Sequence, residues 1–147
     1  MQQEDKVNQE EVFRILNGRL SMLISRYLHT RFREAALGIT VEQWTILAIL
    51  WQKDKVTQQI LSDITMRDKP SITRLIDNLE KRNLVVRIHD SSDRRVNLIY
   101  LTQKGIDLEH KASAIINEVV DKTLAEVSAE EIIICRNVLR KVLENLH

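Results

Sequence analysis

The chain has 147 residues, of which 44% are apolar and 29% charged; this composition is typical of a folded protein and excludes a disordered one. The formal net charge of +1 does not by itself indicate a nucleic-acid partner. No apolar run approaches the roughly 20 residues that span a bilayer, and the polar, acidic start is unlike a signal peptide. We therefore expect a cytoplasmic protein without membrane association. Three glycines and one proline favour a mainly helical fold.

The charges are unevenly distributed. Residues 67–95 contain eight Lys or Arg against five Asp or Glu, whereas residues 117–131 contain one Lys against five acidic residues. Positive charge therefore gathers in the middle of the chain, as a nucleic-acid surface requires. The excess is modest, and a solvated surface can also produce it.

Two helices are expected in the first third of the chain. Apolar residues at three- and four-residue spacing predict a first helix over residues 8–36, with Gly38 as its C-cap. The capping box Thr40-Val-Glu-Gln43 predicts a second helix that ends between Lys53 and Lys55. The apolar stripe of the first helix is Val12, Leu16, Leu20, Leu23, Tyr27 and Leu28.

A short helix and a longer helix follow in close succession. Thr57 opens the short one, whose inward residues are expected to be Ile60, Leu61 and Ile64. After a break at residues 65–67, Asp68 caps the longer helix, Pro70 fits its first turn, and Asn83 is its left-handed C-cap. The buried stripe of this longer helix is Ile72, Leu75, Ile76 and Leu79. Two helices joined by so tight a turn form a helix-turn-helix, which reads the DNA major groove with its second helix.

The apolar period then changes to that of strands. Residues 84–89 and 96–101 are rich in branched side chains, and the polar tip 90–95 separates them. This pattern predicts a β-hairpin with a charged tip. The predicted fold class is therefore mainly α with a small β-hairpin wing, that is, a winged helix-turn-helix.

Two further helices complete the chain, one opened by Thr102 and one by the capping box Ser128-Ala-Glu-Glu131. The single Cys135 excludes an internal disulfide and a multi-cysteine metal site. Because Cys135 shares the apolar stripe of the last helix with Ile132, Val138 and Leu139, we expect a buried, unreactive thiol.

The open face of the longer helix carries the candidate base-reading residues. A reading helix needs small polar and basic groups near its start, and here they are Lys69, Ser71, Thr73, Arg74 and Asn78. Arg74 is able to bind guanine O6 and N7 as a fork. The alternative is that these residues form only a solvated helix face.

The hairpin tip carries a second candidate contact. Arg94 and Arg95 suit the negative potential of a narrow minor groove, and Asp93 can hold an arginine in position. The alternative is a surface hairpin with an exposed ion pair of little energetic value.

The segment from Asp68 to Arg87, followed by Asp93-Arg-Arg95 and Leu101-Thr-Gln-Lys-Gly105, resembles the MarR family of winged-helix regulators. The resemblance covers nearly the whole chain. It implies a homodimer on a pseudopalindromic operator, with interlocked first and last helices. It also implies a wing pair of Asp93 and Arg95, with Arg95 in the minor groove. Ser71, Thr73 and Arg74 would then lie in the major groove.

Two residues depart from the family pattern. Ser92 stands where many members carry a basic residue, so we expect a weaker wing contact. Asn83 stands where glycine is usual, and asparagine tolerates the left-handed conformation that this position requires.

The terminal helices give independent support for a dimer. We expect residues 1–147 to form one domain, in which residues 40–101 are the DNA-binding lobe and residues 8–36 and 103–147 pair two chains. The apolar stripes of these helices are wider than the lobe requires, and unburied they would form a large exposed patch. A two-fold pairing would place two reading helices about 34 Å apart. The alternative is that both stripes pack within one chain.

Many members of the family release DNA when a small aromatic or phenolic effector binds between the dimer helices and the reading domain. By position, the residues expected to line such a pocket are Arg14, Tyr27, His29, Trp44 and Trp51. Core packing is the competing explanation for the two tryptophans. Some members sense organic hydroperoxides through a cysteine near the start of the first helix, and this chain has no cysteine there.

Catalysis is not expected. The four histidines are scattered, no pair of them has a metal-ligand spacing, and no glycine-rich phosphate loop occurs; we expect no cofactor. The open alternative is a winged-helix adaptor that binds protein rather than DNA, since fold alone does not decide function. Its reading helix would show apolar anchors, whereas Lys69 to Arg74 are largely polar.

Overall fold

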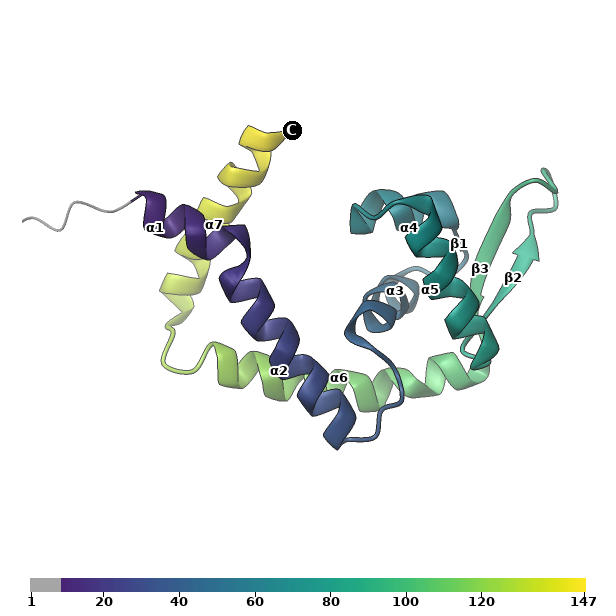
Figure 1. Cartoon of the computed structure of the whole chain (residues 1–147), viewed down its shortest axis with the longest axis horizontal. Helices are drawn as coiled ribbons and strands as arrows, with labels where there is room; N and C mark the ends of the chain where they lie inside the picture. The colour runs from purple at the N-terminus through teal and green to yellow at the C-terminus, as the bar shows by residue number, and fades with distance from the viewer. Residues whose placement is uncertain (1–8) are drawn as a thin grey trace, which may run out of the picture.

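The computed structural model describes residues 9–147, and most of them lie in helices, with one small sheet at an edge of the molecule (Figure 1). In chain order the elements are α1 (Gln9–Arg14), the π-helix η1 (Ile15–Arg19), α2 (Leu20–Glu34), α3 (Val41–Gln52), β1 (Val56–Thr57), α4 (Gln58–Thr65), α5 (Lys69–Lys81), β2 (Val85–His89), β3 (Asn97–Leu101), α6 (Gln103–Thr123) and α7 (Ala129–Leu146). Figure 1 shows α3, α4, α5 and the sheet gathered toward one end of α6, with α1 and α7 toward its other end.

The predicted fold class is confirmed. α4 and α5 form the helix-turn-helix, and the β2–β3 hairpin is the wing, paired in antiparallel register with Arg87 opposite Ile99. A third strand, β1, pairs with β3, so the sheet order is β1-β3-β2. β1 was not predicted, because two residues are too few to show a period of two.

The core of this lobe lies between the helix-turn-helix and the sheet. Its fully buried side chains come from every element of the lobe and include Ile46, Leu47, Leu50, Val56, Leu61, Ile72, Ile76, Leu79, Val85 and Ile99. The stripe predicted for α5 is confirmed in its buried members Ile72, Ile76 and Leu79. Since these residues fix one helix face against the core, the opposite face of α5 is turned outward.

The helix starts follow the predicted caps. The hydroxyls of Thr40, Thr57, Thr102 and Ser128 and the carboxylate of Asp68 each accept a hydrogen bond from a backbone N–H in the first turn of the following helix. At the end of α5, Asn83 takes a left-handed φ of 57°. The Leu84 N–H then donates to the Leu79 carbonyl at 3.0 Å, which closes the C-terminal motif.

The first helix differs from its prediction in two ways, and its predicted start at residue 8 lies outside the described residues. A π segment interrupts it, because Gly18 adopts φ 131°, a conformation that other residues rarely take. Its left-handed C-terminal residue is Ala36 (φ 49°) rather than Gly38, and the Leu37 N–H donates to the Phe32 carbonyl at 2.9 Å. Hydrogen bonding at the helix end thus overrides the preference for glycine.

The prediction of which α4 residues face inward is partly wrong. Leu61 is buried as predicted, but Ile60 and Ile64 are exposed. The second buried residue of α4 is Ser62, whose hydroxyl donates to the Arg67 carbonyl and closes the turn before α5. The buried face is therefore rotated toward Ser62, a shift that apolar spacing alone does not reveal.

α6 joins the lobe to the N-terminal helices. The Trp51 indole N–H donates to the Gly105 carbonyl at 2.9 Å, and Arg31 of α2 pairs with Glu118 at 2.7 Å. This ion pair, together with the pair that Arg31 forms with Glu34, raises the pKa of Arg31. The Lys122 ammonium also lies 4.4 Å from the Tyr27 ring centroid.

The terminal helices leave apolar side chains uncovered in the single chain. No residue of α7 is buried, and Val12, Leu16, Leu20 and Leu23 of the first stripe are all exposed. The alternative in which both stripes pack within one chain is therefore not what the structure shows. The expectation of a buried Cys135 is wrong for the single chain, since its thiol is exposed with the rest of α7. No helix within residues 9–147 is both long and apolar enough to cross a membrane.

Candidate nucleic-acid interface

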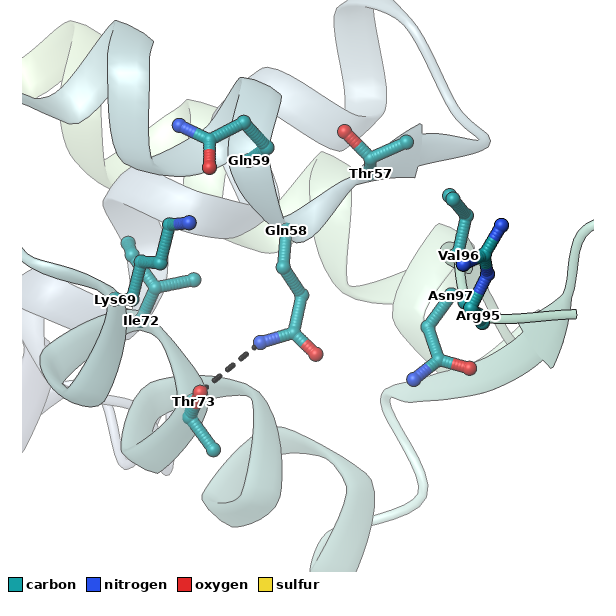
Figure 2. A pocket seen from close by; sticks show the side chains of 9 residues that line it. All are labelled: Thr57, Gln58, Gln59, Lys69, Ile72, Thr73, Arg95, Val96 and Asn97. Atoms are coloured by element: carbon teal, nitrogen blue, oxygen red, sulfur yellow. Dashed lines mark hydrogen bonds between the residues drawn. The ribbon is translucent and has the colours of Figure 1, made fainter. Parts of the chain in front are cut away.

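An open groove lies between the start of α4, the outer face of α5 and the wing (Figure 2). Its volume is about 420 Å³, and its lining is mostly polar: Thr57, Gln58, Gln59, Lys69, Ile72, Thr73, Arg95, Val96 and Asn97. Lys69 stands at one side of the groove and Arg95 at the other. The structure thus brings two residues predicted from the reading helix, Lys69 and Thr73, and one predicted from the wing, Arg95, to the same surface.

The predicted reading residues lie on the outward face of α5. Lys69, Thr73, Arg74 and Asn78 are exposed, and Ser71 is half-buried. The Ser71 hydroxyl donates to the Asp68 carboxylate at 2.9 Å, and the Ser71 N–H donates to it at 2.8 Å. The backbone bond, followed by the hydroxyl bond, holds the pKa of Asp68 below its usual value. The hydroxyl proton of Ser71 is therefore engaged, and its oxygen is left to accept.

Thr73 belongs to a hydrogen-bonded chain that reaches the wing. The Gln58 side-chain N–H donates to the Thr73 hydroxyl oxygen at 3.1 Å, as Figure 2 shows. The side-chain amide oxygen of Gln58 accepts a hydrogen bond from Arg87 Nε at 3.2 Å. Residues from α4, α5 and β2 are thereby joined at one point of the groove.

Arg87 is the residue that sequence reasoning missed. Its guanidinium donates to Asp77 and to Glu80 at 2.6 Å each, and only 19% of its side chain is exposed. These bonds attach the first wing strand to the reading helix. A signal was available in the sequence, since Asp77 and Glu80 are three residues apart on one helix face and Arg87 follows in the adjoining strand.

The wing tip is held by its own carboxylates. Asp90 accepts hydrogen bonds from the hydroxyl and the N–H of Ser92 and from the N–H of Asp93. These bonds, the hydroxyl first, hold the pKa of Asp90 below its usual value. Ser92, which departs from the family pattern, thus has a structural role in the turn.

The wing pair predicted from the sequence, Asp93 and Arg95, is hydrogen-bonded in the structure. Asp93 Oδ1 accepts from the Arg95 N–H at 3.0 Å and from Arg95 Nε at 3.3 Å. The Arg95 side chain is 91% exposed, and Arg94 is exposed beside it. In water such a pair contributes little to stability, so its effect is to orient the arginine.

The five residues expected to line an effector pocket do not line one cavity in the single chain. Trp44 packs edge-on against Phe32, with ring centroids 6.4 Å apart, and Trp51 bonds to α6 as described above. His29 lies 3.5 Å from Glu42, and Tyr27 lies under Lys122. Arg14 borders a different cavity of about 820 Å³, together with Glu11, Ile15, Arg19, Leu20 and Leu23. Core packing, the alternative stated for the tryptophans, accounts for both of them.

In the part of the chain that the structure describes, no group of three or more His, Cys, Asp or Glu side chains has a geometry that could hold a metal ion.

Comparisons with known proteins agree with this geometry. The model of the MarR family matches residues 39–96, which span the helix-turn-helix, the first wing strand β2 and the wing tip. The transcriptional regulator MhqR of Bacillus subtilis (strain 168) is 29% identical over 111 residues, covering 71% of this chain and 72% of MhqR.

Solved structures extend the likeness to the terminal helices. The crystal structure of transcriptional regulator PA3341 is 30% identical, with a TM-score of 0.79 over 91% of this chain and 97% of that one. The S. aureus MepR–DNA complex is 28% identical, with a TM-score of 0.80 over 92% and 96% of the two chains. The protein therefore belongs to the MarR family of transcriptional regulators.

Proposed function

We propose that this protein is a sequence-specific repressor that binds duplex DNA as a homodimer and is released by a small-molecule effector. The observation that carries the proposal is the groove between α5 and the wing, where Lys69, Thr73 and Arg95 face one open surface. Polar and cationic side chains on the outer face of a helix-turn-helix suit the major groove, and an exposed arginine on a wing suits the minor groove. A protein-binding adaptor would instead need apolar anchors on α5.

The relatives support the same function. MepR, which resembles this chain along nearly its whole length, is described in complex with DNA. Within the proposal, Arg74 and Thr73 contact base edges, Lys69, Ser71 and Asn78 contact bases or phosphates, and Arg95, oriented by Asp93 and flanked by Arg94, enters the minor groove.

The dimer is proposed from the uncovered apolar side chains of the terminal helices. Exposed residues such as Leu20, Leu23, Val138 and Leu143 lie on α2 and α7, away from the DNA-binding lobe. Pairing with a second chain would remove this surface from water, at about 25 cal/mol per Å² of apolar area. It would also place two reading helices on one side of the assembly.

The effector is proposed to be a small aromatic or phenolic compound. The cavity beside Arg14 is lined by Glu11, Arg14 and Arg19 and by the apolar side chains of Ile15, Leu20 and Leu23, and the Arg14 guanidinium also donates to Glu10 at 3.3 Å. An aromatic ring with an acidic substituent matches that combination of groups. Because Leu20 and Leu23 also belong to the stripe proposed to pair with a second chain, a ligand bound in this cavity would compete with that pairing.

A binding titration tests the proposed function. Selected and scrambled duplexes are titrated with wild-type protein, Arg74→Ala and Arg95→Ala at several salt concentrations. We expect Arg74→Ala to lose about 1–3 kcal/mol of discrimination at one position per half-site. Arg95→Ala should weaken binding mainly where A·T pairs narrow the minor groove. Weak binding that is equal for both duplexes and insensitive to salt would contradict the proposal.

A further inference from the structure

The hydrogen-bonded chain from Arg87 through Gln58 to Thr73 has a fixed direction. A guanidinium group carries only N–H donors, so the Gln58 atom that faces Arg87 Nε at 3.2 Å must be the amide oxygen. The amide nitrogen of Gln58 must then face Thr73, where it donates to the hydroxyl oxygen at 3.1 Å. A flipped amide would place its NH₂ group against the donors of Arg87.

Arg87 cannot easily turn away to release this constraint. Its two terminal nitrogens are held by Asp77 and Glu80 at 2.6 Å each, and one of them also lies 3.4 Å from the Thr73 carbonyl. Bonds of this kind between charged groups are short and strong. Arg87 therefore sets the orientation of Gln58 before any ligand arrives.

The Thr73 hydroxyl is left with its proton unused. Thr30, Thr45 and Thr65 each donate their hydroxyl proton to the carbonyl four residues earlier. In residues 9–147 the Thr73 hydroxyl has no such acceptor, and its only bond is the one it accepts from Gln58. Thr73 is exposed and lines the groove, so its O–H can point toward a molecule bound there.

We infer that Arg87 and Gln58 are positioning residues that make Thr73 a hydrogen-bond donor toward DNA. This inference rests on the proposed function and adds a chemical preference to it. Thr73 then favours an acceptor, which on DNA is guanine O6 or N7, adenine N7, thymine O4 or a phosphate oxygen. The amino groups of cytosine N4 and adenine N6, which are donors, can meet only the one lone pair of the hydroxyl oxygen that Gln58 leaves free.

A double-mutant cycle on the wild-type operator tests this direction. Gln58→Glu keeps an acceptor toward Arg87 but turns a second acceptor toward Thr73, so the hydroxyl must donate inward and present a lone pair to DNA. Thr73→Val removes the hydroxyl at nearly constant shape. Gln59→Glu is the charge control, because it adds the same charge to the same groove from the next residue; it also breaks the hydrogen bond from the Gln59 amide to Asp63 at 2.7 Å, an effect on the fold that its melting temperature measures. Thermal melting of each variant at one protein concentration checks that it is folded.

With Thr73 present, we expect Gln58→Glu to lose about threefold to tenfold more affinity than Gln59→Glu, the usual effect of one hydrogen bond. In the Thr73→Val background the two glutamate substitutions should cost the same. The uncharged Gln58→Met should weaken the preference of the Thr73 hydroxyl for acceptor groups on DNA without reversing that preference. Single base-pair changes in the operator identify the acceptor. A base-edge acceptor changes the preference at one position per half-site, and a phosphate changes affinity uniformly.

Two outcomes would overturn the inference, and they are distinguishable. Suppose that wild-type protein binds an operator, but Gln58→Glu and Gln59→Glu lose the same operator affinity in the protein that retains Thr73. The inference then fails and the proposed function stands. If wild-type protein binds no duplex above background, both fail.

Discussion

At the scale of single residues, carboxylates organise α5 and the wing, the two elements that are proposed to face DNA. Asp77 and Glu80 hold Arg87 against α5, Asp93 orients Arg95, and Asp90 closes the wing tip. These acids lower the positive charge of the surface and so reduce its attraction for phosphate. The same bonds fix the orientation of the cationic and polar side chains of the groove. A fixed orientation favours specificity for a DNA sequence over affinity for DNA in general.

A pH titration checks the role of Asp90. Its pKa is depressed, chiefly by the Ser92 hydroxyl, so the ionised form stabilises the folded wing tip above the ordinary aspartate value of about 3.9. That contribution is lost as the pH falls through the lower, folded pKa. Ser92→Ala should move the Asp90 pKa back toward its ordinary value, measured by the NMR shift of the carboxyl carbon. Ser91→Ala is the control, and an Asp90 pKa unchanged by Ser92→Ala would contradict the account.

At the scale of elements, close approaches rather than periodicity decide the fit of α6 to the lobe. A Cβ on Gly105 would lie 2.2 Å from the Leu84 carbonyl oxygen, which also accepts from the Thr102 N–H at 3.1 Å. The glycine that ends the segment Leu101 to Gly105 thus permits α6 to begin directly against the end of α5. Gly105 is needed here because a side chain would overlap the Leu84 carbonyl, and not because its backbone adopts an unusual φ.

Replacing Gly105 by alanine tests this contact, because helix propensity and steric overlap predict opposite changes in the free energy of unfolding. Helix propensity alone would make Gly105→Ala stabilising by about 1 kcal/mol, whereas a clash with a held carbonyl should destabilise by about 1–3 kcal/mol. We expect a lower free energy of unfolding in denaturant titrations at fixed protein concentration. Ser113→Ala, on an exposed position of α6, should change it little. A Gly105→Ala protein as stable as the wild type would contradict the close approach.

The parts of the fold that the sequence predicts are those encoded locally. Caps at Thr40, Asp68 and Ser128, the stripe of α5 and the hairpin all depend on residues within a few positions of one another. β1, the π segment at Gly18 and the rotation of α4 depend on partners distant in the chain or on a single backbone angle. For the same reason the outward face of α5 could be predicted, whereas the Arg87 cluster, built from three elements, could not.

At the scale of the whole molecule, the chain has one end that carries the proposed DNA-binding groove and another whose apolar surface is uncovered. α6 spans the two, and the bonds of Trp51 and Arg31 connect it to α3 and α2. A change in how the terminal helices pair would therefore act on the lobe through packed contacts. Cys135, exposed in the single chain, would be covered by the proposed pairing.

A charge on the apolar stripe of α7 tests the dimer. Leu139→Glu places a carboxylate where a partner chain is proposed to pack, and a buried, unpaired charge is costly. We expect the particle mass, measured by light scattering, to fall from twice the chain mass toward one chain mass, with loss of operator affinity. Asn137→Glu, on the opposite face of the same helix, should stay dimeric. A wild-type protein of one chain mass, or a dimeric Leu139→Glu, would argue against this interface.

The central claim is that a pair of these chains reads duplex DNA, and selection of bound duplexes from a random pool tests it most directly. We predict enrichment of two inverted half-sites whose centres are about 10 base pairs apart, one turn of DNA for two reading helices. A pool that remains unenriched after selection, or a consensus without two-fold symmetry, would contradict it.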